Sequence, residues 1–206
     1  IKNGVNVAIV GEPNVGKSTL LNALVEDDRA MVSDVAGTTR DTIEATTIID
    51  GIRFRFVDTA GLRDTDNQLE QMGITRTYRA IENAHVILHL TTADNPEFKS
   101  IELKDNQAYI KVINKIDKPN ARPEDVIDEV FDLFLELGAD DSQLDFPVVY
   151  VSAINGTSSL SDDISTQKET MEPILDLILS HIPEPRVSEG TLQFQPALLD
   201  YNDYVG

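Results

Sequence analysis

The sequence of 206 residues contains no cysteine and no tryptophan. The absence of cysteine excludes disulfide bonds and thiol chemistry. The chain also lacks any apolar run of the 18 or more residues that a membrane helix needs, and no signal-peptide pattern opens it. From these absences we expect a cytoplasmic location and no contact with a membrane.

Basic residues are scarce: 17 Lys and Arg stand against 36 Asp and Glu, which gives a formal net charge of −19. A field of this sign argues against attraction of nucleic acid by the chain as a whole. It does not exclude a nucleotide, because phosphate loops bind through local N–H groups. The length and an apolar fraction of 41% fit one globular domain with a sizeable core.

A phosphate-binding loop stands near the start of the chain. Residues 11–18 read GEPNVGKS and match G-x-x-x-x-G-K-[ST] completely. A strand-type run precedes the loop and a helical pattern follows it, so backbone N–H groups and the helix dipole are expected to face the phosphates. Lys17 would reach the β- and γ-phosphates, and Ser18 would bind Mg²⁺. The residues expected around the phosphates are Asn14, Val15, Gly16, Lys17, Ser18 and Thr19.

Two further loops match the same chemistry. Asp58 ends an alternating strand pattern and would hold the Mg²⁺ shell through water, while the N–H of Gly61 would meet the γ-phosphate. Thr39 lies in a Gly-Thr-Thr-Arg sequence, and its hydroxyl would reach Mg²⁺ only when a γ-phosphate is present. The alternatives are a polar turn without a ligand at Asp58 and a simple turn before a strand at Thr39.

The sequence Asn114-Lys115-Ile116-Asp117 predicts which nucleotide binds. The Asp117 carboxylate can accept hydrogen bonds from N1–H and the 2-amino group of guanine, whereas adenine would leave it unpaired at a cost above about 1–3 kcal/mol. The stem of Lys115 would pack over the base. Downstream, Ser152-Ala153 ends a strand and would offer a backbone N–H to guanine O6; the alternative is an ordinary strand end.

The pattern of apolar residues predicts an α/β fold. We expect a P-loop NTPase three-layer sandwich, with a mainly parallel six-stranded sheet and one antiparallel edge strand from a hairpin at Asp50-Gly51. Ligands then lie at the carboxyl ends of the strands, and Asp117 meets the base if the strand at 107–113 docks beside the first strand. Residues 154–169 read as a surface loop. Predicted strands are 5–10, 43–50, 53–58, 85–91, 107–113 and 146–151, and predicted helices are 17–26, 71–83, 123–137 and 171–182.

Together these motifs resemble the translation-factor-like class of P-loop GTPases. Residues 1 to about 90 resemble the G domain of the MnmE (TrmE) family, in Gly11–Asn22, Ala36–Asp41, Asp58–Arg63 and Glu70–Ile74. Residues from about 112 onward resemble the BipA (TypA) family, in Asn114–Pro123, Asp128–Phe134, Leu144–Tyr150, Met171–Ile174 and Leu199–Gly206. This join predicts a chimera or a designed sequence, and a natural homologue colinear over all 206 residues would contradict that hypothesis.

The resemblance to MnmE implies a potassium-assisted mechanism. Asn14 would bind K⁺ together with backbone carbonyls around 33–36, and two G domains would pair across the ion as a homodimer. Leu62 stands where other GTPases carry the glutamine that orients water, and Glu70 would take that role. The open alternatives are a turn residue at Asn14 and an acid that stabilises a helix N-terminus at Glu70.

The resemblance also implies a domain plan and an activity. Residues 1–185 are expected to form the GTPase (G) domain, and 186–206 resemble the truncated start of a following β domain. GTP hydrolysis to GDP is expected to be slow, with Glu70, Lys17, Thr39 and Gly61 as the catalytic groups. The two families imply partners in tRNA modification or on the ribosome, although their binding domains are not in this sequence. The alternatives are a guanine-nucleotide-binding module and a designed scaffold with little turnover.

Overall fold

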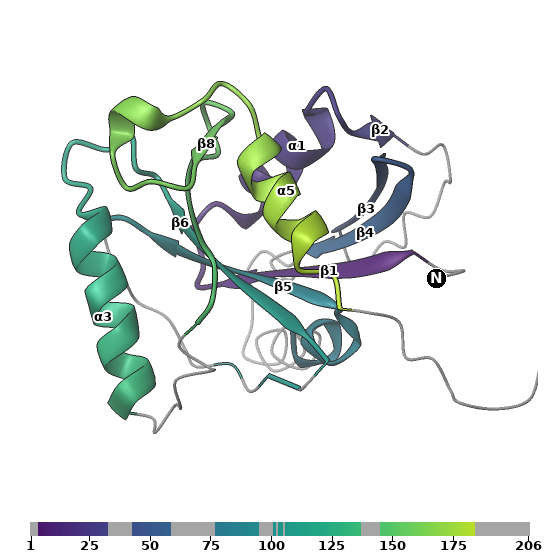
Figure 1. Cartoon of the computed structure of the whole chain (residues 1–206), viewed down its shortest axis with the longest axis horizontal. Helices are drawn as coiled ribbons and strands as arrows, with labels where there is room; N and C mark the ends of the chain where they lie inside the picture. The colour runs from purple at the N-terminus through teal and green to yellow at the C-terminus, as the bar shows by residue number, and fades with distance from the viewer. Residues whose placement is uncertain are drawn as a thin grey trace, which may run out of the picture.

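The computed structural model describes residues 4–32, 43–58, 77–94, 101, 103–104, 106–136 and 145–183. These residues form one sheet of eight strands flanked by helices (Figure 1). The strands are β1 (Val5–Gly11), β2 (Met31–Val32), β3 (Ile43–Ile49), β4 (Ile52–Asp58), β5 (Val86–Thr92), β6 (Ala108–Asn114), β7 (Val148–Ser152) and β8 (Thr157–Ser159). The helices are α1 (Lys17–Glu26), α3 (Pro123–Glu136), α5 (Glu172–Ser180) and the 3₁₀ helix η1 (Ile164–Thr166), and residues 77–83 are helical as well.

The sheet has the order β2-β3-β4-β1-β5-β6-β7-β8. Strands β4, β1, β5, β6 and β7 pair in parallel. Strand β3 returns antiparallel to β4 through Asp50 and Gly51, which have φ angles of 50° and 80°. Positive φ at both turn residues is the conformation that two-residue hairpins favour. The predicted α/β fold with a mainly parallel sheet is therefore confirmed.

Two expectations about the sheet were wrong in detail. Short strands β2 and β8 extend it at both edges, each antiparallel to its neighbour, so the described residues form more than six strands. Strand β8 and helix η1 lie within 154–169, the segment predicted to be a surface loop. The residues of β8 are small and polar, and this strand forms because β7 and Lys168 supply backbone partners for Ser158.

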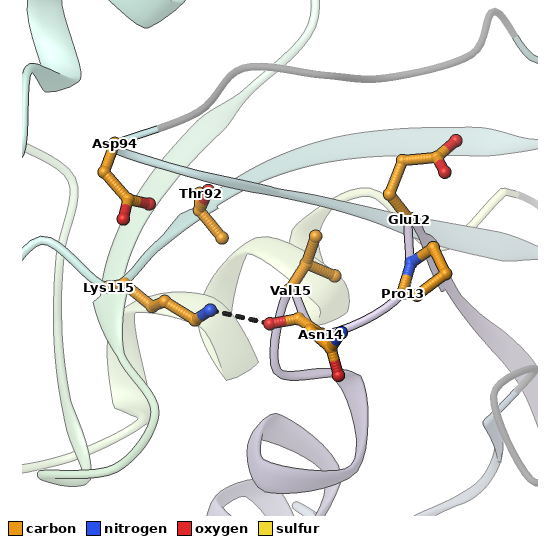
Figure 2. A pocket seen from close by; sticks show the side chains of 7 residues that line it. All are labelled: Glu12, Pro13, Asn14, Val15, Thr92, Asp94 and Lys115. Carbon is orange, nitrogen blue, oxygen red and sulfur yellow. Dashed lines mark hydrogen bonds between the residues drawn. The ribbon is translucent and has the colours of Figure 1, made fainter. Parts of the chain in front are cut away.

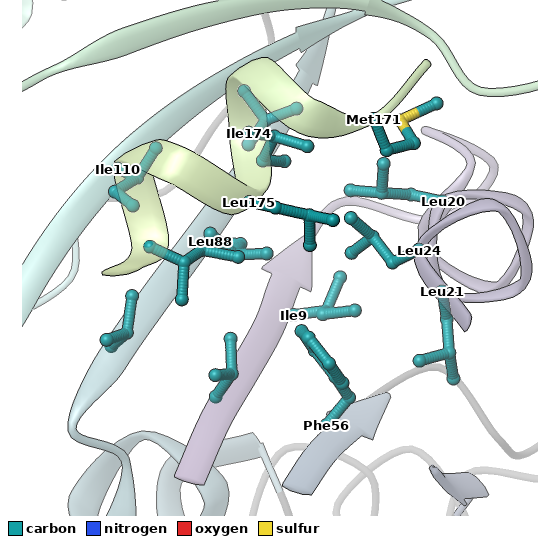
Figure 3. Packing of buried hydrophobic residues seen from close by; sticks show 14 of the residues in the cluster. Ile9, Leu20, Leu21, Leu24, Phe56, Leu88, Ile110, Met171, Ile174 and Leu175 are labelled. Carbon is teal, nitrogen blue, oxygen red and sulfur yellow. The ribbon is translucent and has the colours of Figure 1, made fainter. Parts of the chain in front are cut away.

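Apolar side chains cover both faces of the sheet, as parallel sheets require. On one face, α1 and α5 meet over the central strands, where Leu20, Leu24 and Leu175 lie close to Ile9 (Figure 3). On the other face, Ile81 of the helical segment 77–83 packs in a second cluster and Val126 of α3 in a third. All seven residues of β5 are buried. The site-bearing strand ends are thus held by a rigid three-layer core.

Charged side chains fix the position of α5. The Asp27 carboxylate accepts a 2.8 Å hydrogen bond from the backbone N–H of Met171, at the N-terminus of this helix. Arg29 pairs with Asp176 of α5 at 2.7 Å and also with Asp50 of the β3–β4 turn. The connection after α1 is therefore tied both to α5 and to the β3–β4 turn.

A group of buried polar side chains lies on β5 and β6. His89 Nδ1 and the Tyr109 hydroxyl are 2.9 Å apart, and Tyr109 also packs against Phe134 of α3. Lys111, directly opposite His89 in the strand register, is fully buried. Burial lowers the pKa of Lys111 to about 7, and burial followed by the charge of Lys111 holds the pKa of His89 well below its usual value.

Replacing Lys111 with methionine tests this burial. The unfolded chain holds the lysine proton up to its ordinary pKa of 10.5, whereas the folded chain releases it near 7. The unfolded state thus binds more protons in this window, and the stability of the wild type rises with pH. Between pH 7 and pH 9 the wild type should gain about 2 kcal/mol relative to Lys111→Met. Urea unfolding of both proteins at three pH values measures the difference, and parallel pH curves would contradict it.

Candidate nucleotide-binding site

The loop between β1 and α1 has the backbone of a phosphate cradle. Asn14 and Gly16 adopt left-handed conformations, with φ angles of 63° and 99°. Gly16 is the N-cap of α1, and its carbonyl accepts the N–H of Leu20 at 2.9 Å. Because glycine has no side chain with which to cap a helix, the first N–H groups of α1 remain available to an anion.

Lys17 lies across the mouth of this loop. Its ammonium donates hydrogen bonds to the carbonyls of Gly11 at 2.8 Å and Glu12 at 2.7 Å, and the residue is only 5% exposed. Burial lowers the pKa of Lys17, and the nearby Asp58 carboxylate partly opposes that shift. A buried ammonium placed at a helix N-terminus suits a ligand that carries several negative charges.

Ser18 and Asp58 bring hard oxygen atoms together beside the loop. The Ser18 hydroxyl donates to Asp58 Oδ2 at 2.6 Å. Asp58 ends β4, pairs with Ile9 of β1 in the register, and is 1% exposed. Within the described ranges no group of three or more His, Cys, Asp or Glu side chains gathers around a point. One carboxylate and one hydroxyl fit Mg²⁺, which takes its other ligands from phosphates and water.

Asn114 joins the phosphate loop to the far side of the sheet. It ends β6 and is 2% exposed. Its amide nitrogen donates to the carbonyl of Val15 at 2.8 Å, and its amide oxygen accepts the N–H of Ala153 at 3.1 Å. Next to it, Lys115 Nζ donates to the carbonyl of Asn14 at 2.6 Å (Figure 2). Both residues therefore hold the loop after β6 against the phosphate loop.

The Asp117 carboxylate is oriented from β7. The hydroxyl of the buried Ser152 donates to Asp117 Oδ1 at 2.6 Å, while Asp117 itself is exposed. Ile116, between Asn114 and Asp117, is 2% exposed and anchors the loop in the core. One oxygen of the carboxylate is thus held by a hydrogen bond, on a residue that is exposed.

The structure brings most of the predicted site residues to one edge of the sheet. They lie in the last residues of β4, β6 and β7, in the loops after β1, β6 and β7, or in the first turn of α1: Asn14, Val15, Gly16, Lys17, Ser18, Thr19, Asp58, Asn114, Lys115, Asp117, Ser152 and Ala153. Thr39, Gly61, Leu62, Glu70 and the predicted K⁺ loop at 33–36 lie outside the described residues. Residues 184–206 do so as well.

The strand that precedes the loop at 115–122 does not dock directly beside the first strand, which was the condition set for Asp117 to meet the base. Strand β5 lies between β1 and β6. Asn114 still reaches the phosphate loop because its amide and the Lys115 side chain extend over the end of β5. The two halves of the chain therefore share one sheet and one site.

Two site residues were not predicted from the sequence. Thr92, the last residue of β5, and Asp94, two residues beyond it, line a pocket of about 230 Å³ opposite Glu12, Pro13, Asn14 and Val15, with Lys115 beside them (Figure 2). Asp94 pairs with Lys118 at 2.8 Å. Their place in the sequence could have predicted them, because they lie at the carboxyl end of a buried parallel strand, where ligands bind in such sheets.

This fold and this loop arrangement define a P-loop nucleotide-binding protein. The model of one protein family, described as "50S ribosome-binding GTPase", matches residues 6–121, which is more than half of the chain. The chain belongs to this GTPase family.

Individual relatives refine the comparison. The tRNA modification GTPase MnmE of Flavobacterium psychrophilum is 55% identical over 115 residues, covering 56% of this chain and 24% of that protein. The large ribosomal subunit assembly factor BipA of Bacillus subtilis is 40% identical over 220 residues, covering 98% of this chain and 35% of that protein. The chain thus spans about a third or less of these relatives. The BipA alignment runs across the predicted junction, and the hypothesis of a chimera stays a prediction.

Solved structures agree with the fold. Era of Aquifex aeolicus, bound to GDP and AlF₄⁻, superposes with a TM-score of 0.57 at 28% identity, covering 89% of this chain and 58% of that chain. A second Era structure, in complex with MgGDPNP and a segment of 16S ribosomal RNA, gives a TM-score of 0.56 at 27% identity. Within the described part of the present chain, no helix is long and apolar enough to cross a membrane.

Gly16→Ala tests the contact between the two loops. A Cβ at Gly16 would lie 2.4 Å from Asn114 Nδ2, so the bond to Val15 would break. A buried amide that loses its partner costs about 1–3 kcal/mol, and we expect GDP affinity to fall about tenfold or more. A titration with a fluorescent GDP analogue measures this. Gly51→Ala is the matched control, because Gly51 also has positive φ but nothing within 4 Å; equal losses in both variants would contradict the assignment.

Proposed function

We propose that this chain binds GTP with Mg²⁺ and hydrolyses it to GDP and phosphate in a switch-loop cycle. The observation that carries the proposal is the pair of bonds from Asn114 and Lys115 to the phosphate loop. These bonds combine the phosphate loop with the loop of residues 115–122 between β6 and α3, which we call the base-reading loop, into one site. Membership of a GTPase family supports the same conclusion.

The phosphate half of the site has a distinct task. Lys17 would leave the carbonyls of Gly11 and Glu12 for the β- and γ-phosphate oxygens, and the N–H groups of the loop would bind the remaining charge. Ser18, Thr39 and, through water, Asp58 would hold Mg²⁺, which neutralises charge on the phosphate oxygens when it is bound. The short bond between Ser18 and Asp58 supports this pairing of ligands.

The base half of the site selects guanine. The Asp117 carboxylate would accept from N1–H and the 2-amino group, and the stem of Lys115 would pack over the ring. The N–H of Ala153, predicted to contact guanine O6, donates to Asn114 Oδ1 at 3.1 Å, so a contact with O6 would share this N–H. The Ser152 hydroxyl supports the assignment of Asp117, because it fixes one of its two oxygens.

Hydrolysis needs groups beyond these. In the proposed mechanism Glu70 would orient the attacking water, and the N–H of Gly61 would meet the γ-phosphate. Asn14 would hold K⁺, which would supply the positive charge that an arginine finger supplies elsewhere. A cation in that role accelerates turnover by about 10³–10⁵. Intrinsic turnover is therefore slow until K⁺ binds and two G domains pair. A guanine-nucleotide-binding module with little turnover is the alternative.

A cellular role follows only from the relatives. Their names associate them with tRNA modification and with assembly of the large ribosomal subunit, and we infer a cytoplasmic role in one of these processes. The net charge of −19 opposes a broad electrostatic contact of this chain with RNA. Residues 186–206 would begin a following β domain, and 1–185 would form the G domain.

The proposed potassium site predicts a dependence of turnover on the monovalent cation. GTP hydrolysis by the full chain should be at least tenfold faster in KCl than in NaCl at equal ionic strength, because the resemblance to MnmE assigns K⁺ to Asn14. Release of phosphate measures the rate, and GDP affinity measured in both salts is the control. Equal rates near zero in both salts would refute hydrolysis and leave the nucleotide-binding module.

Asp117→Asn tests the choice of base. The amide offers a donor where the carboxylate accepted, so affinity should fall for GDP and rise for xanthosine diphosphate. A loss of at least tenfold for GDP is expected, which corresponds to about 1.4 kcal/mol. Competition titrations against a fluorescent analogue measure both ligands. Asp128→Asn, an exposed position on α3, is the matched control, and an unchanged GDP affinity in Asp117→Asn would refute the role of Asp117.

A further inference from the structure

The base-reading loop is anchored on two sides. On the side of the phosphate loop and β7, Asn114 contacts Val15 and Ala153, and Asp117 contacts Ser152. These contacts hold the loop up to Asp117. The next residue, Lys118, has a side chain that is 41% exposed and pairs with a carboxylate beyond the end of β5.

Asp94 meets Lys118 on that second side. It lies two residues beyond the end of β5, and its Oδ2 accepts from Lys118 Nζ at 2.8 Å. The Asp94 side chain is 17% exposed, so it is the more buried partner of the pair. The hydrogen bond from Lys118, ahead of one from Thr92, holds the pKa of the Asp94 carboxyl below its usual value.

The backbone next to Asp94 is bound to both ends of the same loop. The N–H of Ala93 donates to the carbonyl of Asn114 at 2.8 Å, and the carbonyl of Ala93 accepts the N–H of Arg122 at 2.7 Å. Ala93 is fully buried in a cluster with Ile116. Asp94 therefore projects from a rigid point, and its position relative to the loop is fixed by packing as well as by hydrogen bonds.

We propose that Asp94 is a positioning residue that sets the selectivity for guanine. With Ser152 on one side and the Asp94–Lys118 pair on the other, the Asp117 carboxylate lies between two fixed points. Asp94 also keeps the Lys118 ammonium away from the neighbouring Asp117 carboxylate, which would otherwise lose part of its charge to an internal ion pair. This proposal rests on the proposed binding of guanine nucleotides.

The test compares GDP with inosine diphosphate, which lacks only the 2-amino group. Asp117 makes two hydrogen bonds to guanine and one to hypoxanthine, so its correct orientation favours GDP. In Asp94→Asn the ratio of the two dissociation constants, Kd for inosine diphosphate over Kd for GDP, should fall about threefold to fivefold, the range expected for a partly exposed ion pair. The affinity for inosine diphosphate itself should change less than twofold.

Two further variants distinguish positioning from damage to the fold. Lys118→Gln removes the other partner and should lower the same ratio, and the exchange Asp94→Lys with Lys118→Asp should restore it. Asp176→Asn breaks the ion pair with Arg29 at α5 and should leave the ratio unchanged. Circular dichroism and thermal unfolding of each variant report whether it is folded.

The outcomes separate this inference from the proposed function. No binding of GDP by the wild-type chain would refute the proposed function itself. Binding of GDP by the wild type with an unchanged ratio in both Asp94→Asn and Lys118→Gln would refute only the positioning role. Equal weakening of GDP and inosine diphosphate would assign Asp94 to the general stability of the loop and would likewise overturn the proposal.

Discussion

The site depends on the side chain of one buried residue, Asn114. Its amide joins Val15, 99 positions earlier in the chain, to Ala153, 39 positions later. Both halves of the amide are used, and the residue is 2% exposed, so loss of either partner would leave a buried polar atom at a cost of about 1–3 kcal/mol. The phosphate loop and the end of β7 are therefore held in place by the same group.

The order of the strands explains why such a link is needed. Strand β1 has β4 on one side and β5 on the other. Strand β5 therefore separates the phosphate loop after β1 from the base-reading loop after β6. Side chains bridge this gap, and one of them is Lys115, which donates to the carbonyl of Asn14. Both residues have a left-handed backbone that is unusual for non-glycine residues, with φ angles of 61° at Lys115 and 63° at Asn14. Strained backbone of this kind persists where the surrounding structure holds it, and it is concentrated at functional sites.

Local chemistry in the sequence predicted much of this arrangement. The spacing of Gly11, Gly16 and Lys17 predicted a phosphate loop, and the apolar patterns before and after it predicted a strand and a helix. The structure has these two elements at 5–11 and 17–26. Features that arise from pairing across the sheet were not predicted. Lys111 looks like an ordinary polar residue until His89 on the neighbouring strand and the covering layer bury it. The strand β8 is too short and too polar for an alternating pattern, and it forms because β7 presents an open edge.

The distribution of charge separates ligand binding from contact with larger partners. Helix α3 has acidic residues in its first turn and no basic residue in its last turn, and the chain as a whole carries −19. The site nevertheless gathers Lys17, Lys115 and Lys118, two of them on backbone carbonyls and one on Asp94. Lys17 is 5% exposed, and screening by salt is weak for a buried charge. A small polyphosphate can thus bind against an unfavourable overall field, whereas a long nucleic acid, which samples the whole surface, would meet the acidic excess.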